Sequence, residues 1–180
     1  MTRDLATLYG IGYAPAPGTV ASLVSAVAAA LLLQLPYGWA LLALGAIASL
    51  RIGIKASTRH MREGGTSHDP SQIVIDELHG QWLTFTVWHL WMVALAGFGS
   101  AVVLLENVAG QPIYLALGFV LFRFYDIIKP WPISLVDRRV KGGFGVMFDD
   151  LLAGVAAGTT LYAIHLFWPL LTGQMDEMAV

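Results

Sequence analysis

Two long runs without a formal charge, Gln81–Leu105 and Leu151–Thr172, constrain the fold of this chain more than any other feature. They contain 25 and 22 residues, and a helix that crosses a bilayer needs about 20 predominantly apolar residues. The whole chain is 57% apolar and 12% charged, whereas soluble domains average about 45–50% and 25%. In the second run, Gly154 and Gly158 would permit close helix packing in lipid. These features predict an all-α integral membrane protein.

Shorter apolar stretches add to these two runs. Thr19–Leu35 and Tyr37–Leu50 are separated by a proline, and they form two short helices, a re-entrant hairpin or one broken span. Ile113–Phe122 is short, but it lengthens if Arg123 faces protein or lipid headgroups. We therefore predict a polytopic helical bundle with four to five membrane segments, formed by a single domain over residues 1–180.

The basic residues predict the orientation of this bundle. Nine of the ten Lys and Arg residues gather in two regions: Arg51, Lys55, Arg59 and Arg62, then Arg123, Lys129, Arg138, Arg139 and Lys141. Cytoplasmic loops of membrane proteins are enriched in Lys and Arg, so both regions are expected to face the cytoplasm. The net charge of −2 does not suggest nucleic-acid binding, and the absence of Cys excludes disulfides and thiolate metal sites.

Two acid pairs, Asp76-Glu77 and Asp149-Asp150, stand directly before the long uncharged runs. Helix capping is one explanation, because acidic groups at a helix N-terminus bind its unpaired N–H groups. A cap needs only one carboxylate, however, and adjacent carboxylates repel each other. Ionisable groups at membrane depth mark functional sites, and carboxylate clusters suit Mg²⁺. We therefore favour a shared Mg²⁺ site at the cytoplasmic mouth of the bundle.

A cationic segment follows the third apolar stretch. Asp126 and Lys129 stand three residues apart at a helix end that Pro130 stops. Arg138 and Arg139 either anchor the chain to anionic headgroups or bind phosphate together with Lys129. Carboxylates for a metal, cations for phosphate and a cytoplasmic membrane face together indicate phosphoryl chemistry on a lipid.

Gly18 and Thr19 precede a helix of small residues. They form either a plain turn and N-cap or an anion-binding helix N-terminus. Composition alone favours the turn and cap.

Four sequence blocks carry a resemblance to a known family. They read APGTVASL, DPSQIVIDELHGQW, FRFYDIIKPWPISLVDRRV and GGFGVMFDDLLAG, and they fall within about residues 10–23, 69–82 and 122–154. In content, order and spacing they resemble the phosphatidylglycerophosphatase A family. The resemblance implies an all-helical, Mg²⁺-dependent phosphatase of the bacterial inner membrane, which removes the terminal phosphate of phosphatidylglycerol phosphate. The matching motif residues are Asp69, Asp76, Glu77, Asp126, Lys129, Asp137, Arg138, Asp149, Asp150, Pro17, Gly18 and Thr19.

On this hypothesis each charged group has an expected role. Catalytic residues that also bind the metal are the paired acids Asp76, Glu77, Asp149 and Asp150. A further catalytic ligand or base is Asp126. Contacts to phosphate and headgroup are expected from Lys129, Arg138, Arg139, Thr19 and Gly18. The nucleophile is water or a carboxylate, and we favour water because clustered acids are better explained as ligands.

Two other functions stay open from the residues alone. A small cation transporter or channel would use the acids as an ion path, although such acids are expected deeper in the spans. A lipid headgroup transferase would require a nucleotide. The expected partners are the lipid substrate and membrane lipids, without nucleic acid, and the oligomeric state is open. The expected location is the bacterial inner membrane, crossed several times, with the active site facing the cytoplasm.

Overall fold

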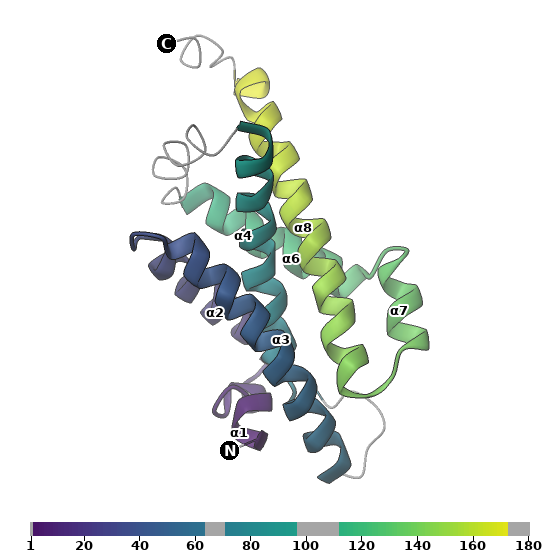
Figure 1. Cartoon of the computed structure of the whole chain (residues 1–180). Coiled ribbons are helices and arrows are strands. Elements are labelled where there is room, and N and C mark those ends of the chain that lie inside the picture. The colour runs from purple at the N-terminus through teal and green to yellow at the C-terminus, as the bar shows by residue number, and fades with distance from the viewer. Residues whose placement is uncertain (1, 64–70, 97–111, 173–180) are drawn as a thin grey trace.

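The computed structural model describes residues 2–63, 71–96 and 112–172, and every regular element within them is a helix. Figure 1 labels these elements. They are α1 (Thr2–Ala6), the 3-10 helix η1 (Ile11–Tyr13), α2 (Pro17–Leu33), α3 (Gly38–Glu63), α4 (Ile75–Ala96), α6 (Pro112–Ile128), α7 (Ile133–Arg139) and α8 (Gly142–Thr172). The all-α prediction is confirmed for this part of the chain. Asp69 and residues 97–105 of the first uncharged run lie outside the described residues.

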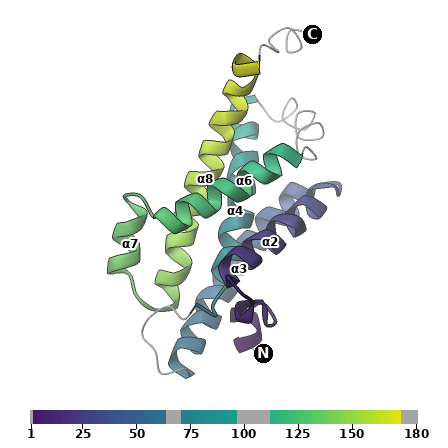
Figure 2. The ribbon, with the colours of Figure 1, turned by 180° about the vertical axis from the view of Figure 1, so that it is seen from behind.

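α4 is the central helix, and it packs against α8, α3, α2 and α6. α8 runs along α4 in Figure 1, and the reverse view in Figure 2 shows α6 crossing the outside of both helices. Leu42, Phe85, Trp88, Tyr114 and Leu161 form the main buried cluster between these elements.

Glycines bring α4 and α8 into close contact. A Cβ atom built at Gly154 would overlap the carbonyl oxygen of Gly80, and one built at Gly158 would overlap that of Thr84. The close packing predicted at Gly154 and Gly158 is therefore confirmed, because only a residue without a side chain lets the two backbones approach so closely. This contact brings the acid pair at the start of α4 beside the acid pair of α8.

Two helices extend further than the uncharged runs indicate. α8 begins at Gly142, two turns before the expected start at Leu151, so its acid pair lies inside the helix. α3 continues through Arg51 and Lys55 to Glu63. Its 26 residues measure about 39 Å, more than the hydrocarbon thickness of about 30 Å. The basic end of α3 therefore extends beyond what a bilayer core would cover.

Two of the described helices are long and apolar enough to cross a membrane: α3 and the Gly142–Trp168 part of α8. α2 is apolar but shorter. Large apolar side chains are exposed along α2, α3, α6 and α8, and a soluble monomer rarely exposes large apolar patches. These features indicate a membrane protein, whereas the four to five membrane segments stay a prediction.

Candidate active site

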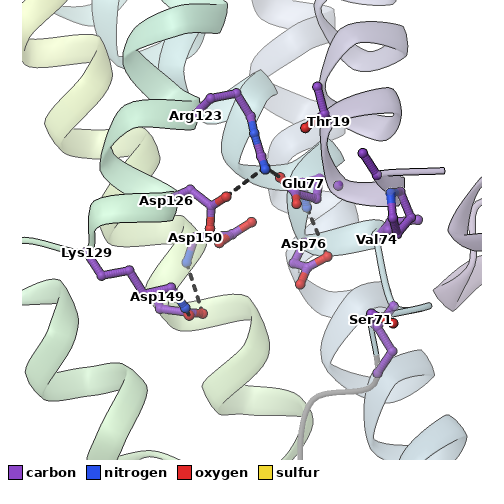
Figure 3. A pocket seen from close by; sticks show the side chains of 14 residues that line it. Thr19, Ser71, Val74, Asp76, Glu77, Arg123, Asp126, Lys129, Asp149 and Asp150 are labelled. Atoms are coloured by element: carbon purple, nitrogen blue, oxygen red, sulfur yellow. Dashed lines mark hydrogen bonds and ion pairs between the residues drawn. The ribbon is translucent and has the colours of Figure 1, made fainter.

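A pocket of about 340 Å³ lies where the N-termini of α2 and α4 meet the end of α6 and the first turns of α8. In Figure 3, the side chains from α6 and α8 enter on one side, and those from α4 enter on the other. Its charged lining residues are Asp76, Glu77, Arg123, Asp126, Lys129, Asp149 and Asp150. Both acid pairs, which are far apart in the sequence, therefore meet in one place.

The α4 acids belong to the first turn of their helix, and both are buried. The Glu77 Oε2 atom accepts a hydrogen bond of 2.8 Å from the Ser22 hydroxyl of α2. A Cβ atom at Gly18 would overlap the Glu77 carboxylate, so Gly18 lets α2 approach this acid. Asp76 and Glu77 interact favourably with the dipole at the start of α4. Glu77 also contacts Ser22 of α2 and Arg123 of α6, which helix capping alone does not explain.

Arg123 connects α4 to α6 across the pocket. Its Nη1 atom lies 2.6 Å from Glu77 Oε2 and 2.7 Å from Asp126 Oδ2. All three side chains are largely buried, and a buried charge needs such a partner to offset its lost hydration. The prediction of site residues omitted Arg123. The signal was present in the sequence, because Arg123 interrupts an apolar helix three residues before Asp126, on a neighbouring position of the helix surface.

The α8 acids lie seven and eight residues after the helix start at Gly142, and both are buried. Only the first four N–H groups of a helix lack an intrahelical partner, so capping is wrong as an explanation for Asp149 and Asp150. The Asp149 Oδ2 atom accepts a hydrogen bond from Lys129 Nζ. The Oδ2 atom of Asp150 is buried without a hydrogen-bond partner among the described residues.

Lys129 stands between the pocket and the surface. Besides Asp149, its ammonium group contacts Asp137 Oδ1 of α7 at 2.7 Å. Desolvation lowers the pKa of Lys129, but the hydrogen bonds and charges of Asp137 and Asp149 outweigh it and raise the pKa above its ordinary value. The hydrogen bond from Lys129 lowers the pKa of Asp137. The charged form of Lys129 is therefore favoured where it lines the pocket.

The remaining predicted phosphate contacts separate into two groups. The predicted turn and Thr19 cap are wrong, because α2 begins at Pro17 after the N-cap residue Ala16, without a side-chain cap. Gly18 and Thr19 lie in the first turn of α2 and line the pocket. Arg138 and Arg139 are exposed on α7 and are not among the pocket-lining residues. The structure therefore brings Lys129 to the acids but leaves the two arginines on the outer surface.

The lining residues fit a hard divalent cation in their chemistry. Carboxylates are the preferred ligands of Mg²⁺, and the Oδ2 atom of Asp150 is a buried acceptor that no donor among the described residues reaches. As placed, no three acidic or histidine side chains of the described residues are close enough to hold one ion. Lys129 engages Asp149 and Arg123 engages Glu77, so coordination by these acids would require the two ion pairs to loosen.

Comparison with known proteins identifies the family. A family model described as Phosphatidylglycerophosphatase A matches residues 5–165. A relative named phosphatidylglycerophosphatase A from Escherichia coli (strain K12) is 35% identical over 92% of this chain and 84% of its own length. Its namesake from Haemophilus influenzae is 32% identical over 92% of this chain and 89% of its own.

A third relative has a different name. A putative phosphatidylinositol-3-phosphatase from Bacteroides thetaiotaomicron is 30% identical over 84% of this chain and 85% of its own length. No solved structure matches this chain. The extent of the family match and of the two like-named relatives shows that this chain belongs to the phosphatidylglycerophosphatase A family.

Proposed function

We propose that this chain is a lipid phosphatase that hydrolyses the terminal phosphomonoester of phosphatidylglycerol phosphate, releasing phosphatidylglycerol and inorganic phosphate. One observation carries this proposal: acids and cations from α4, α6 and α8 converge in a single pocket of a phosphatidylglycerophosphatase A family member. Phosphoryl transfer depends mainly on positioning and charge stabilisation, and this pocket has the groups for both.

The cations of the pocket are the groups that would bind the phosphate. Its acidic neighbours favour the charged form of Lys129, and the side chain lines the pocket, where it can donate hydrogen bonds to phosphate oxygens. Arg123 adds a second donor on the same wall. The N-terminus of α2 at Gly18 and Thr19 contributes a favourable dipole for an anion. Arg138 and Arg139 would act outside the pocket on anionic headgroups.

The acids require a further cation before an anion can bind. Among the described residues, five carboxylates and two basic side chains line the pocket, so acids outnumber bases there and would repel a phosphomonoester. We propose that Asp76, Glu77, Asp149 and Asp150 hold Mg²⁺. A bound Mg²⁺ would supply charge stabilisation to the transferring phosphoryl group. Asp126 would serve as a further ligand or would accept a proton from the attacking water.

The membrane arrangement is part of this proposal. The single domain would cross the inner membrane several times, with α3 and α8 as two of the crossings. The basic end of α3 and the basic α7 region would face the cytoplasm. Lys129 belongs to the second group of basic residues, Arg123 to Lys141, and it lines the pocket. The pocket would therefore open toward the cytoplasmic face.

Phosphate release from purified protein in detergent tests the function, because no ion gradient exists there. We expect release from phosphatidylglycerol phosphate in the presence of Mg²⁺, loss of release with EDTA, and recovery when Mg²⁺ is added back. Full turnover by metal-free protein would contradict the Mg²⁺ assignment. A nucleotide requirement would instead support a transferase, and ion flux without phosphate release would support a transporter.

The name of the Bacteroides thetaiotaomicron relative favours one second candidate, a phosphatase of phosphatidylinositol 3-phosphate. The same assay distinguishes the two lipids when both are presented at equal surface concentration. A higher kcat/KM for phosphatidylinositol 3-phosphate would replace the proposed substrate and keep the phosphatase chemistry.

A further inference from the structure

α6 has three different faces along its length. Tyr114, Gly118 and Phe122 are spaced by four residues and are buried against the bundle. Arg123 and Asp126 point into the pocket from an adjoining face. Because a helix has 3.6 residues per turn, a third face lies between these two. It has exposed apolar side chains, which we call the α6 stripe: Ile113, Val120, Phe124, Ile127 and Ile128.

No described helix covers the α6 stripe. Ile127 is 66% exposed and Ile128 is 59% exposed, and Trp131 after the helix is 79% exposed. Figure 2 shows α6 on the outside of α4 and α8, with no described helix in front of it. Such large exposed side chains form an apolar surface that needs a ligand or lipid to cover it.

The α6 stripe continues directly into the pocket. Arg123 and Ile127 are four residues apart, so their Cβ atoms are neighbours on the helix surface, about 5–6 Å from each other. Lys129, which also lines the pocket, stands between Ile128 and Trp131 in the sequence. An apolar surface and a cationic pocket wall therefore meet at the C-terminal end of α6.

We propose that the α6 stripe binds the acyl chains of a lipid phosphomonoester whose phosphate lies in the pocket. This inference rests on the proposed phosphatase function, and it adds the surface that holds the rest of the substrate. Acyl chains gain free energy by leaving water, whereas a phosphate requires cations when it loses hydration. From Ile113 to Ile128 the helix rises about 22 Å, more than one hydrocarbon leaflet of about 15 Å.

The basic residues distinguish α6 from the other helices that expose apolar side chains. Both basic residues of the pocket lining, Arg123 and Lys129, belong to α6 or directly follow it. α2 also reaches the pocket and exposes Leu23 and Val27, but it contains no Lys or Arg. Once the proposed Mg²⁺ offsets the acids, a lipid phosphate would therefore bind at the α6 wall of the pocket, and its chains would then lie next to the α6 stripe.

A double substitution, Phe124→Gln with Ile127→Gln, tests this surface. Gln has good helix propensity, so α6 should be retained, and thermal unfolding in detergent checks that it is. Val27→Gln on α2 and Ile47→Gln on α3 are matched controls, because these side chains are 53% and 55% exposed. Each protein is assayed in Mg²⁺ with long-chain and with dibutanoyl phosphatidylglycerol phosphate.

The double variant should lower the long-chain to short-chain ratio of kcat/KM about tenfold, because long chains cover far more of the α6 stripe than butanoyl chains do. The two controls should stay within about twofold of the wild-type ratio. An equal loss in the α2 control, or an unchanged ratio in the double variant, would overturn the α6 assignment and leave the phosphatase proposal intact.

Photolabelling provides a readout that does not depend on turnover. A diacyl lipid phosphate with a photoreactive acyl chain should label residues 112–131 in preference to α2 and α3. Unlabelled lipid phosphate should compete with the photoreactive lipid and reduce this labelling, whereas diacylglycerol should not. Labelling centred on α2 or α3 would overturn the inference, and absence of phosphate release from either lipid by the wild-type protein would overturn it together with the proposed function.

Discussion

Several residues of this pocket have ionisable side chains whose burial is unfavourable unless a partner compensates the charge. Asp149 and Asp150 are 6% and 4% exposed, and ionised groups are seldom buried to this extent unless they are paired or coordinate metals. Lys129 pairs with Asp149, but no described donor reaches the Oδ2 atom of Asp150. The acid in the least compensated position is therefore the most sensitive probe of what the pocket binds.

Asp150→Asn should abolish activity and preserve folding. Asn has nearly the same size as Asp, and loss of one charge relieves repulsion within the acid cluster. Loss of a ligand of the proposed Mg²⁺ would instead lower the rate by orders of magnitude. Phosphate release and thermal unfolding in detergent measure the two effects, and Asp76→Asn should behave alike. The exposed Glu63→Gln substitution on α3 is the control. Near-normal turnover of both Asp variants at saturating Mg²⁺ would remove these acids from the catalytic site.

Arg123→Met should destabilise the protein as well as inactivate it. Removal of one partner from a buried ion pair costs about 3–5 kcal/mol, because the other charge remains buried, and Arg123 serves both Glu77 and Asp126. The unfolding transition in detergent should shift to lower temperature. Arg59→Met is the matched control, since Arg59 pairs with Glu63 on the exposed surface of α3 and such pairs contribute little. Equal stability of the two variants would contradict the bridging role of Arg123.

At the scale of elements, the packing of α4 on α8 decides whether the acid pairs can act together. The two helices touch at Gly154 and Gly158 of α8, where a Cβ atom would overlap the backbone carbonyl oxygens of Gly80 and Thr84 of α4. The acid pairs lie on the same helices, within five residues of the contact between Gly80 and Gly154. A change in the separation of α4 and α8 therefore changes the distance between the two acid pairs.

Gly154→Ala should reduce both activity and stability without altering any charge. Its new methyl group would meet the Gly80 carbonyl at 2.6 Å, and overpacking of this kind typically costs about 1–3 kcal/mol. Thermal unfolding and phosphate release are the measurements. Val155→Ala, one residue along α8 and 38% exposed, should leave both values nearly unchanged. Wild-type behaviour of Gly154→Ala would mean that the helices can separate without consequence for the site.

At the scale of the whole molecule, the exposed apolar surface and the basic residues define how the chain would sit in a bilayer. Large exposed apolar side chains cover several helices, whereas nine of ten basic residues occupy two regions. The second region contributes Arg123 and Lys129 to the pocket lining, and the first lies on α3, which packs against α4 and α8. The pocket would therefore lie at the cytoplasmic boundary of the hydrocarbon, where a lipid phosphate is located.

Cysteine labelling tests this orientation, because the chain contains no natural Cys. A cysteine at Ser134 on α7 should react only with reagents that reach the cytoplasm. A cysteine at Tyr37, which is 78% exposed between α2 and α3, should react from the opposite side, since that connector has no basic residue. The measurement uses an impermeant maleimide on right-side-out vesicles. Labelling of the Ser134 variant from outside would contradict the cytoplasmic placement of the pocket.

The sequence by itself determined the all-helical architecture, the family and most of the pocket. Uncharged runs and adjacent acids are local patterns, and a single helix displays them without help from its neighbours. Asp76, Glu77, Asp126, Lys129, Asp149 and Asp150 were therefore recognisable before any fold was known, and the structure places them in one pocket. Their roles as ligands or bases stay predictions.

Only the tertiary structure decided which charges face each other. The start of α8 at Gly142 could not be predicted from an uncharged run, because charged residues enter a helix when partners such as Lys129 compensate them. Arg123 reaches Glu77 and lines the pocket, whereas Arg138 and Arg139 are exposed on α7. Arg123, Arg138 and Arg139 are all arginines, so residue type does not distinguish them. The direction of each side chain depends on how α6 and α7 pack against α4 and α8, and that packing joins segments distant in the sequence.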